Sequence, residues 1–233
     1  MRARKGVRHH FRLSARPSSA AGQIARRQAP YEFSAFLHTG ARWQSNANVG
    51  PSSLNILALG QDAVLSPQFG KRPDWNWFEL VAAQYFHRFN KRGDGLEATF
   101  IGYSAQQFRL NQFDLTLVEG TLGPRIVIDP NTSFKLYGIG TYANLAHNDY
   151  INAYGAGYSV RGTVNNFTAE GYFEWRFRRF YNSLEYPTAA EQTGNLFTTA
   201  VNTELRFGIV RLTGRFGYDR NAARSDVEFN SFN

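Results

Sequence analysis

Apolar and polar residues alternate along most of the chain from residue 31 onward. In the first such stretch one face carries Tyr31, Phe33, Ala35, Leu37, Thr39, Ala41 and Trp43, and the other carries Glu32, Ser34, His38, Gly40 and Arg42. Successive side chains of a β-strand point to opposite faces of a sheet, whereas a helix would wrap both sets around one cylinder. The period therefore predicts an amphipathic strand over residues 31–43, with aromatic side chains at both ends.

The same pattern predicts eight further strands. The clearest covers residues 167–178, where Phe167, Ala169, Gly171, Phe173, Trp175 and Phe177 alternate with Thr168, Glu170, Tyr172, Glu174, Arg176 and Arg178. The others are expected at residues 75–89, 96–105, 111–128, 133–144, 150–158, 196–207 and 210–219. Aromatic residues and glycine are frequent, and turn-forming residues such as Pro130 and Asn131 separate the strands, so the chain is expected to be all-β.

The connections between these strands differ in length at the two ends of the sheet. Residues 44–74 form a long polar loop after the first strand, and residues 182–195 form another after the seventh. At the opposite end the connections are compact, at residues 90–95, 129–132, 161–166 and 207–209. Bacterial outer-membrane barrels have short periplasmic turns and longer extracellular loops. The asymmetry predicts a periplasmic N-terminus and places the residues after 219 at the start of an extracellular loop.

Together these features predict an all-β fold, an antiparallel up-and-down transmembrane β-barrel, over residues 31–233. A tilted membrane strand needs about 9–11 residues, and most of the expected strands reach that length. Single-chain bacterial barrels have even strand numbers, and unpaired strand edges are not tolerated in lipid. With about nine or ten strands present, we expect the barrel to be partial, with strands missing on the C-terminal side.

Charge separates the first thirty residues from the rest. The formal net charge is +8, and eight basic residues precede the first acidic one, Glu32; they are Arg2, Arg4, Lys5, Arg8, Arg12, Arg16, Arg26 and Arg27. The remainder is therefore neutral, which does not fit a nucleic-acid-binding domain. We interpret residues 1–30 as a basic linker or a remnant of an upstream domain. They lack the apolar core of a signal peptide, so either that signal lies upstream of Met1 or the interpretation as a barrel is wrong.

Four short motifs carry a family resemblance. They are Gln44-Ser45-Asn46-Ala47-Asn48 after the first strand, Asp74-Trp75-Asn76 at the second, Gly93-Asp94 in the next turn, and Gly123-Pro124-Arg125. In placement they resemble the barrel of the surface lipoprotein assembly modifier family and its tetratricopeptide-linked relatives. The resemblance covers residues 33–125 and implies a periplasmic repeat domain followed by a barrel that helps to move proteins, notably lipoproteins, across the outer membrane. The sequence departs from the family pattern in having no repeat domain, no signal peptide and too few strands.

The two strand faces supply the candidate site residues. On the polar face, Glu32, Arg42, Glu170, Glu174, Arg176 and Arg178 are expected to face the lumen, where they could act on a substrate or simply pair across strands. On the apolar face, Tyr31, Trp43, Trp75, Phe167, Phe173, Trp175 and Phe177 are expected to face lipid or form an aromatic girdle. Tyr31, Trp43, Trp75 and Trp77 could instead form a carbohydrate-stacking platform.

The sequence contains little that indicates catalysis. His147, Asn148 and Asp149 share one loop and His38 lies on a polar strand face, but Asn, Asp and His are common in loops because they favour turns. The chain has no cysteine, which excludes disulfides and cysteine-ligated metals. We expect no enzyme, no catalytic residue, no metal site and no cofactor.

The predicted function is a porin-like pore of the Gram-negative outer membrane that takes part in protein transport or secretion. Its expected partners are outer-membrane lipid and a translocated protein cargo, with no nucleic acid. Two alternatives remain. One is a soluble all-β carbohydrate-binding domain, in which the aromatic face would be buried between two sheets. The other is a basic-leader protein of an organelle or a nucleic-acid complex.

Overall fold

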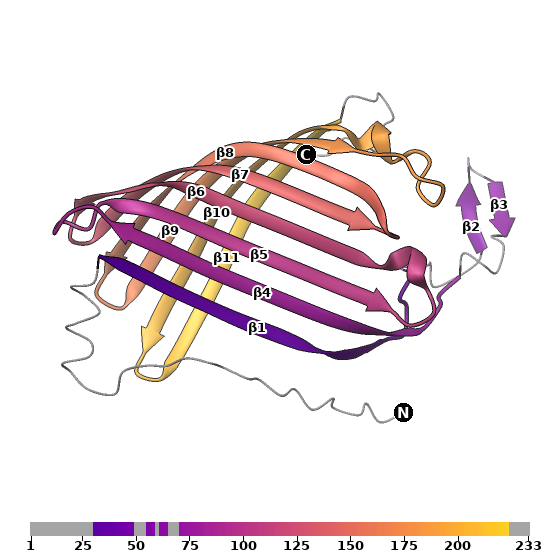
Figure 1. The fold of residues 1–233 in the computed structure, drawn as a ribbon, viewed down its shortest axis with the longest axis horizontal. Coiled ribbons are helices and arrows are strands. Elements are labelled where there is room, and N and C mark those ends of the chain that lie inside the picture. The colour runs from indigo at the N-terminus through magenta and orange to yellow at the C-terminus, as the bar shows by residue number, and fades with distance from the viewer. Residues whose placement is uncertain (1–29, 49–54, 59–60, 65–69, 224–233) are drawn as a thin grey trace.

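The computed structural model describes residues 30–48, 55–58, 61–64 and 70–223. Within them, nine strands form one antiparallel sheet in which each strand pairs with its neighbours along the sheet order β1-β4-β5-β6-β7-β8-β9-β10-β11 (Figure 1). The strands are β1 (Tyr31–Gln44), β4 (Asp74–Arg88), β5 (Gly95–Gln107), β6 (Leu115–Asp129), β7 (Thr132–Leu145), β8 (Asn148–Val164), β9 (Phe167–Phe180), β10 (Gly194–Phe207) and β11 (Val210–Ala223). The interpretation of residues 1–30 as a linker or a remnant of an upstream domain concerns, except for Pro30, residues outside the described part of the chain.

All nine predicted strands are present in this sheet, and four boundaries needed correction. The ninth strand extends to Ala223 instead of ending at residue 219, so residues 220–223 belong to the strand and not to the loop expected after it. The fourth strand begins at Leu115, because Asn111–Phe113 forms a 3-10 turn rather than extended chain. The sixth strand extends to Val164, so its turn is confined to Asn165 and Asn166. The loop after the seventh strand ends at Gly194 and contains a second 3-10 turn, Ala189–Gln192.

The sequence predicts an irregular loop after β1, but part of this connection is regular. It contains a two-stranded hairpin formed by β2 (Asn55–Ala58) and β3 (Gln61–Val64). These short segments carry apolar residues such as Ile56, Leu57 and Val64, which favour strand pairing but are too few to produce a visible period-two pattern.

The nine strands are staggered. A row of residues, each paired with the next one on the neighbouring strand, crosses the whole sheet from β11 to β1. It runs from Ala223, the last residue of β11, through Gly194, Arg178, Ala153, Thr141, Glu119, Ile101 and Ala82 to Phe36 in β1. Since β1 continues to Gln44, the register slips by roughly one residue per strand. With about 3.3 Å per residue and about 4.8 Å between strands, that slip corresponds to strands inclined by about 35° to the axis around which the sheet curves. Strands in closed barrels are tilted by about 35–45°.

Glycine permits close approach of strands where the sheet coils. A Cβ added to Gly155 on β8 would lie 2.0 Å from the carbonyl oxygen of Trp175 on β9. A Cβ on Gly157 would meet the ring of Tyr137 on β7 and the side chain of Glu174 at 2.9 Å. Neither contact is compatible with a larger residue, so these positions let the sheet curve strongly. Figure 1 shows the result, in which β9 to β11 pass behind β1, β4 and β5.

The sheet has two edges within the described residues. β1 pairs only with β4, and β11 pairs only with β10, so no strand pairing joins the first strand to the last. The antiparallel up-and-down meander predicted from the sequence is confirmed, but the described strands form an open, curved sheet rather than a closed barrel.

Candidate functional site

Side chains from distant strands meet on one face of the sheet. Arg176 on β9 contacts Glu119 on β6, and Lys135 on β7 contacts Glu97 on β5. β6 and β9 are separated by two strands, which spaces them by about 14 Å along the sheet. Their side chains can touch only on the inner side of a curve, so these contacts define the concave face.

An ion-pair network lies at the centre of the concave face. Arg176 Nη1 lies 2.5 Å from Glu119 Oε2, and Arg176 Nη2 lies 2.8 Å from Glu174 Oε2. Tyr137 donates its hydroxyl to Glu174 Oε1 at 2.9 Å, and Thr141 donates to Glu119 Oε2 at 2.9 Å. The three charged side chains are only 14–22 % exposed. Charges at this depth must be paired and hydrogen-bonded, and these are.

A second cluster surrounds Glu97. Its two carboxylate oxygens contact Lys135 Nζ at 2.7 Å and Arg125 Nη1 at 3.4 Å. The guanidinium of Arg125 also lies 3.8 Å from the centre of the Phe86 ring, close enough for a cation–π interaction. The cluster joins β4, β5, β6 and β7 on the concave side.

The six residues expected on the polar face all lie on the concave face, although not in one cluster. Glu174 and Arg176 belong to the central network. Glu32 pairs with Arg88 at 2.7 Å, and Arg42 donates to the Tyr103 hydroxyl at 3.4 Å. Arg178 donates to Asn221 on β11, and Glu170 lines a hollow near the turn end of β8 to β11. Whether this face lines a lumen stays a prediction.

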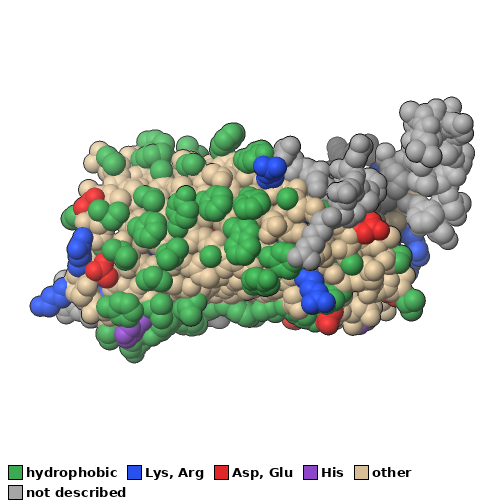
Figure 2. Space-filling model, turned by 90° about the horizontal axis from the view of Figure 1, so that it is seen from above, with side chains coloured by type: hydrophobic (Ala, Val, Ile, Leu, Met, Phe, Trp, Pro, Cys, Tyr) green, Lys and Arg blue, Asp and Glu red, His purple; other side chains and the backbone are tan. Residues whose placement is uncertain are grey.

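The apolar face is convex. Tyr31, Trp43, Trp75 and Phe167 are 42–59 % exposed there. Phe173, Trp175 and Phe177 share this face but are half-buried, because rings such as Tyr154, Tyr158 and Phe197 pack beside them. Figure 2 shows hydrophobic side chains spread over the middle of the molecule, with charged side chains at its two ends.

The convex face carries a belt free of Asp, Glu, Lys, Arg, Asn and Gln side chains. The belt begins at the short-turn end of each strand and ends at the first charged or amide side chain on the convex face. These side chains are Glu79 on β4, Gln106 on β5, Asn144 on β7, Asn152 on β8, Arg179 on β9, Asn195 on β10 and Arg220 on β11. The stretches below them span roughly 9–12 residues, close to the length that crosses a bilayer as a tilted strand. The large exposed side chains within the belt include Val81, Leu122, Val160 and Phe216.

Three loops pack together at the opposite, long-loop end of the concave face. Leu110, Ala146 and Ala189, one from each loop, are 2–9 % exposed. Tyr186 donates its hydroxyl to the carbonyl of Gln112 at 2.9 Å, which ties the β9–β10 loop to the β5–β6 loop. Burial raises the pKa of the Tyr186 hydroxyl, and neighbouring Tyr150 and Glu185 add to the rise. The β9–β10 loop, called the strap below, thus covers part of the long-loop end of the concave face, called the mouth below.

Three of the four motifs that carry the family resemblance lie at strand ends or in turns, whereas Gly123-Pro124-Arg125 lies inside β6, where Arg125 pairs with Glu97. Gln44 Oε1 accepts from Asn76 Nδ2 at 2.8 Å, and Asn48 bonds both Gly70 and Arg72 at 2.8 Å. The buried Asp74 carboxylate accepts the backbone N–H groups of Trp75, Arg109 and Leu110; the distances are 2.8–2.9 Å. Their role in the described residues is therefore architectural.

Asp94 anchors the turn between β4 and β5. Its carboxylate accepts from the Asn90 side chain at 2.9 Å and from the backbone N–H of Val127 at 2.7 Å. These bonds, with the nearby charge of Arg92, lower the pKa of Asp94 below its ordinary value of 3.8. Gly93 has a φ of 101°, a backbone conformation that glycine adopts readily.

The histidine-containing loop serves the β7–β8 turn. His147 Nε2 lies 3.4 Å from Asp114 Oδ2, Asn148 donates to the Ala146 carbonyl at 2.9 Å, and Asp149 accepts the Tyr142 hydroxyl at 2.6 Å. His38 packs edge-on against Phe78. Among the described residues no group of three His, Cys, Asp or Glu side chains is arranged to hold a metal ion, and no helix is long and apolar enough to span a membrane.

Sequence reasoning missed the partners that complete the concave network. Glu97, Glu119, Lys135 and Tyr137 each alternate with apolar neighbours, which was a usable signal for their face. Their pairing across two or three strands depends on the curvature of the sheet, which the period along one strand does not encode.

Compared with protein-family models, with curated proteins and with solved structures, the chain gives no significant match.

Proposed function

We propose that residues 31–223 form most of a β-barrel that spans the outer membrane of a Gram-negative cell. The observation that carries the proposal is the opposition of the two faces. A water-soluble protein seldom exposes an apolar area as wide as the convex belt. A β-barrel in a membrane needs that belt on the outside and tolerates charges only on the inside.

The geometry of the sheet supports the same proposal. Its slope of about 35° falls at the lower limit for closed barrels. The belt matches the thickness of the hydrocarbon region. The described residues form no second large sheet against which the aromatic face could pack, which favours a membrane barrel over the soluble sandwich.

Closing the barrel requires further strands. β1 and β11 run in the same direction because they are the first and ninth strands of an antiparallel meander. An antiparallel barrel therefore needs an odd number of additional strands between these edges. We propose that such strands cover both edges in the assembled protein, since an unpaired edge in lipid leaves backbone N–H and C=O groups without partners.

The orientation follows from the connections. Two-residue turns join β6 to β7, β8 to β9 and β10 to β11 at one end, where six residues join β4 to β5. The longer β1–β4, β5–β6 and β9–β10 loops lie at the other end, together with the two-residue β7–β8 turn. We place the short turns in the periplasm. The polar concave face would then line a passage, and the family resemblance makes a translocated protein, such as a lipoprotein, the proposed cargo.

Cell fractionation tests the proposal. The protein is expected in the outer-membrane fraction, with an electrophoretic mobility that changes on boiling, as a folded barrel resists unfolding in detergent. Recovery of full-length, folded protein in the soluble fraction would overturn it.

A further inference from the structure

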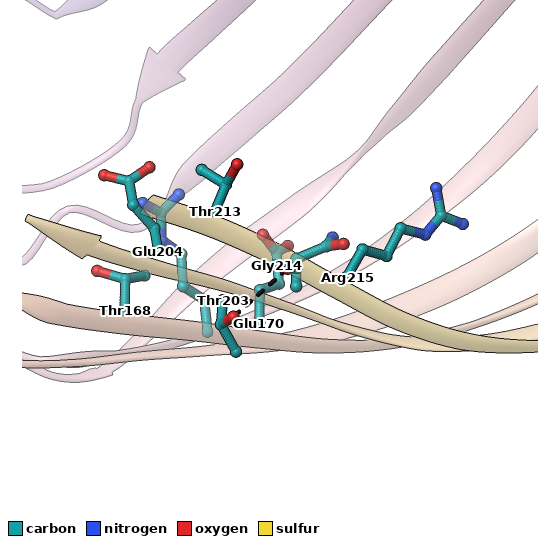
Figure 3. A pocket seen from close by; sticks show the side chains of 9 residues that line it. Thr168, Glu170, Thr203, Glu204, Thr213, Gly214 and Arg215 are labelled. Carbon is teal, nitrogen blue, oxygen red and sulfur yellow. Dashed lines mark hydrogen bonds between the residues drawn. The ribbon is translucent and has the colours of Figure 1, made fainter. Parts of the chain in front are cut away.

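The turn end of the concave face carries an excess of arginine. A hollow of about 490 Å³ opens there between β8 and β11, and its lining includes Arg161, Glu170, Glu204 and Arg215. Figure 3 labels Glu170, Glu204 and Arg215 among the side chains that line it. Two more arginines, Arg206 and Arg211, flank it at the β10–β11 turn. Four guanidinium groups therefore face two carboxylates in this corner.

The carboxylate of Glu204 is already neutralised. Arg206 pairs with it directly, Arg211 Nε lies 3.5 Å away, and Arg161 lies within electrostatic reach. The register explains this crowding, because Glu204 and Arg206 point to the concave side of β10 and Arg211 stands opposite Arg206 on β11. Three positive charges thus surround one negative charge.

Two of these arginines form no close ion pair, although Arg161 stands opposite Glu170 in the register of β8 and β9. Among the described residues, neither Arg161 nor Arg215 has a carboxylate oxygen within 4 Å. Arg215 lies over the ring of Tyr172, 5.7 Å from its centre, which steadies the side chain without neutralising it. Elsewhere on the concave face, Glu97, Glu119 and Glu174 balance Lys135, Arg125 and Arg176.

We propose that this corner binds a small polyanion, one that carries phosphate or carboxylate groups, between Arg161 and Arg215. A guanidinium donates paired N–H groups that match the oxygen geometry of either group. Thr168, Asn202 and Thr213 line the same hollow and add neutral hydrogen-bonding groups. Glu170 opposes the ligand by its charge and therefore limits affinity. The proposal adds a ligand class to the proposed pore and rests on that function for its role in transport.

Inorganic pyrophosphate, titrated calorimetrically into the full chain folded in detergent micelles, tests the site. We expect binding that weakens as salt is added. The double variant R161Q/R215Q should bind about tenfold more weakly, since it loses both guanidinium groups that would hold the anion. E170Q should bind more tightly than the native chain. The control is R220Q, which removes one positive charge from the convex face and should change the affinity by less than about twofold.

The outcomes separate the site from the proposed function. Absence of pyrophosphate binding, or equal binding by R161Q/R215Q and the native chain, overturns the anion site. Boiling-dependent mobility, measured on each sample, shows that the variants are folded. Failure of the same protein to insert into lipid vesicles would overturn the membrane proposal, whatever the calorimetric result.

Discussion

Arg176 on β9 and Glu119 on β6 are in contact at 2.5 Å, although two strands separate them in the sheet. Arg176 also holds Glu174, so one guanidinium joins two carboxylates that would otherwise repel each other. We expect Arg176→Met to lower the free energy of unfolding by about 1–3 kcal/mol, because it leaves both acids without their cation.

Denaturant unfolding in detergent micelles measures that loss. The matched control is Arg220→Met, on the convex face, which should stay within about 0.5 kcal/mol of the native chain. Adding Glu119→Gln to Arg176→Met should recover part of the stability. Equal effects of Arg176→Met and Arg220→Met would contradict the network.

The convex belt should be intolerant of charge. Leu122 lies on this face of β6 and is 55 % exposed, and we expect Leu122→Arg to cost about 2–4 kcal/mol when the protein is folded in lipid vesicles. The control is Ser34→Arg on the exposed concave side of β1, which should fold normally because its charge would face water. A protein whose convex face is in contact with water would tolerate both substitutions, and that result would contradict the membrane belt.

The strap across the long-loop mouth depends on the Tyr186 hydroxyl. Tyr186→Phe removes the bond to the Gln112 carbonyl but keeps the ring contact with Tyr150, 5.8 Å between centres. The loss of one hydrogen bond worth about 1 kcal/mol should make the open form of this loop roughly fivefold more populated. We therefore expect chymotrypsin to cleave after the exposed Leu184 roughly fivefold faster in the variant. Tyr181→Phe is the control, since it removes the Asn152–Tyr181 bond instead. A cleavage rate unaffected by Tyr186→Phe would show that the Tyr186–Gln112 hydrogen bond does not hold the loop in place.

The Asp94 turn should make stability dependent on acid. The pKa of this carboxyl is lower in the folded chain than its ordinary value of 3.8. Its contribution is therefore fully present above the unfolded pKa and is lost as the pH falls through the folded pKa. We expect the native chain to be more stable than Asp94→Asn at neutral pH, with the difference vanishing in acid. A difference that is constant with pH would contradict the assignment.

The sequence predicted the strands well because each one has its own alternating pattern. Even positions of β9 point to one face of the sheet and odd positions to the other. This alternation alone predicted the face of Glu174 and Arg176 and that of Phe173 and Trp175. The 3-10 turn at Asn111–Phe113 was missed because Phe113 continues the alternation of the following strand, in step with Leu115 and Leu117. The cross-sheet partners were missed for a different reason. The meeting of Arg176 with Glu119 requires curvature and stagger, which depend on small residues such as Gly155 in other strands.

Alternating water access along a strand is the most direct test of the central claim. The chain has no cysteine, so single cysteines can be placed without further change. On β11, positions 213, 215 and 217 lie on the concave side, whereas Leu212, Phe216 and Tyr218 face the convex side. In intact outer membranes we expect a water-soluble maleimide to label cysteines at 213, 215 and 217 and to spare those at 212, 216 and 218. Equal labelling of both sets, or labelling of the convex set alone, would contradict a membrane barrel with a polar interior.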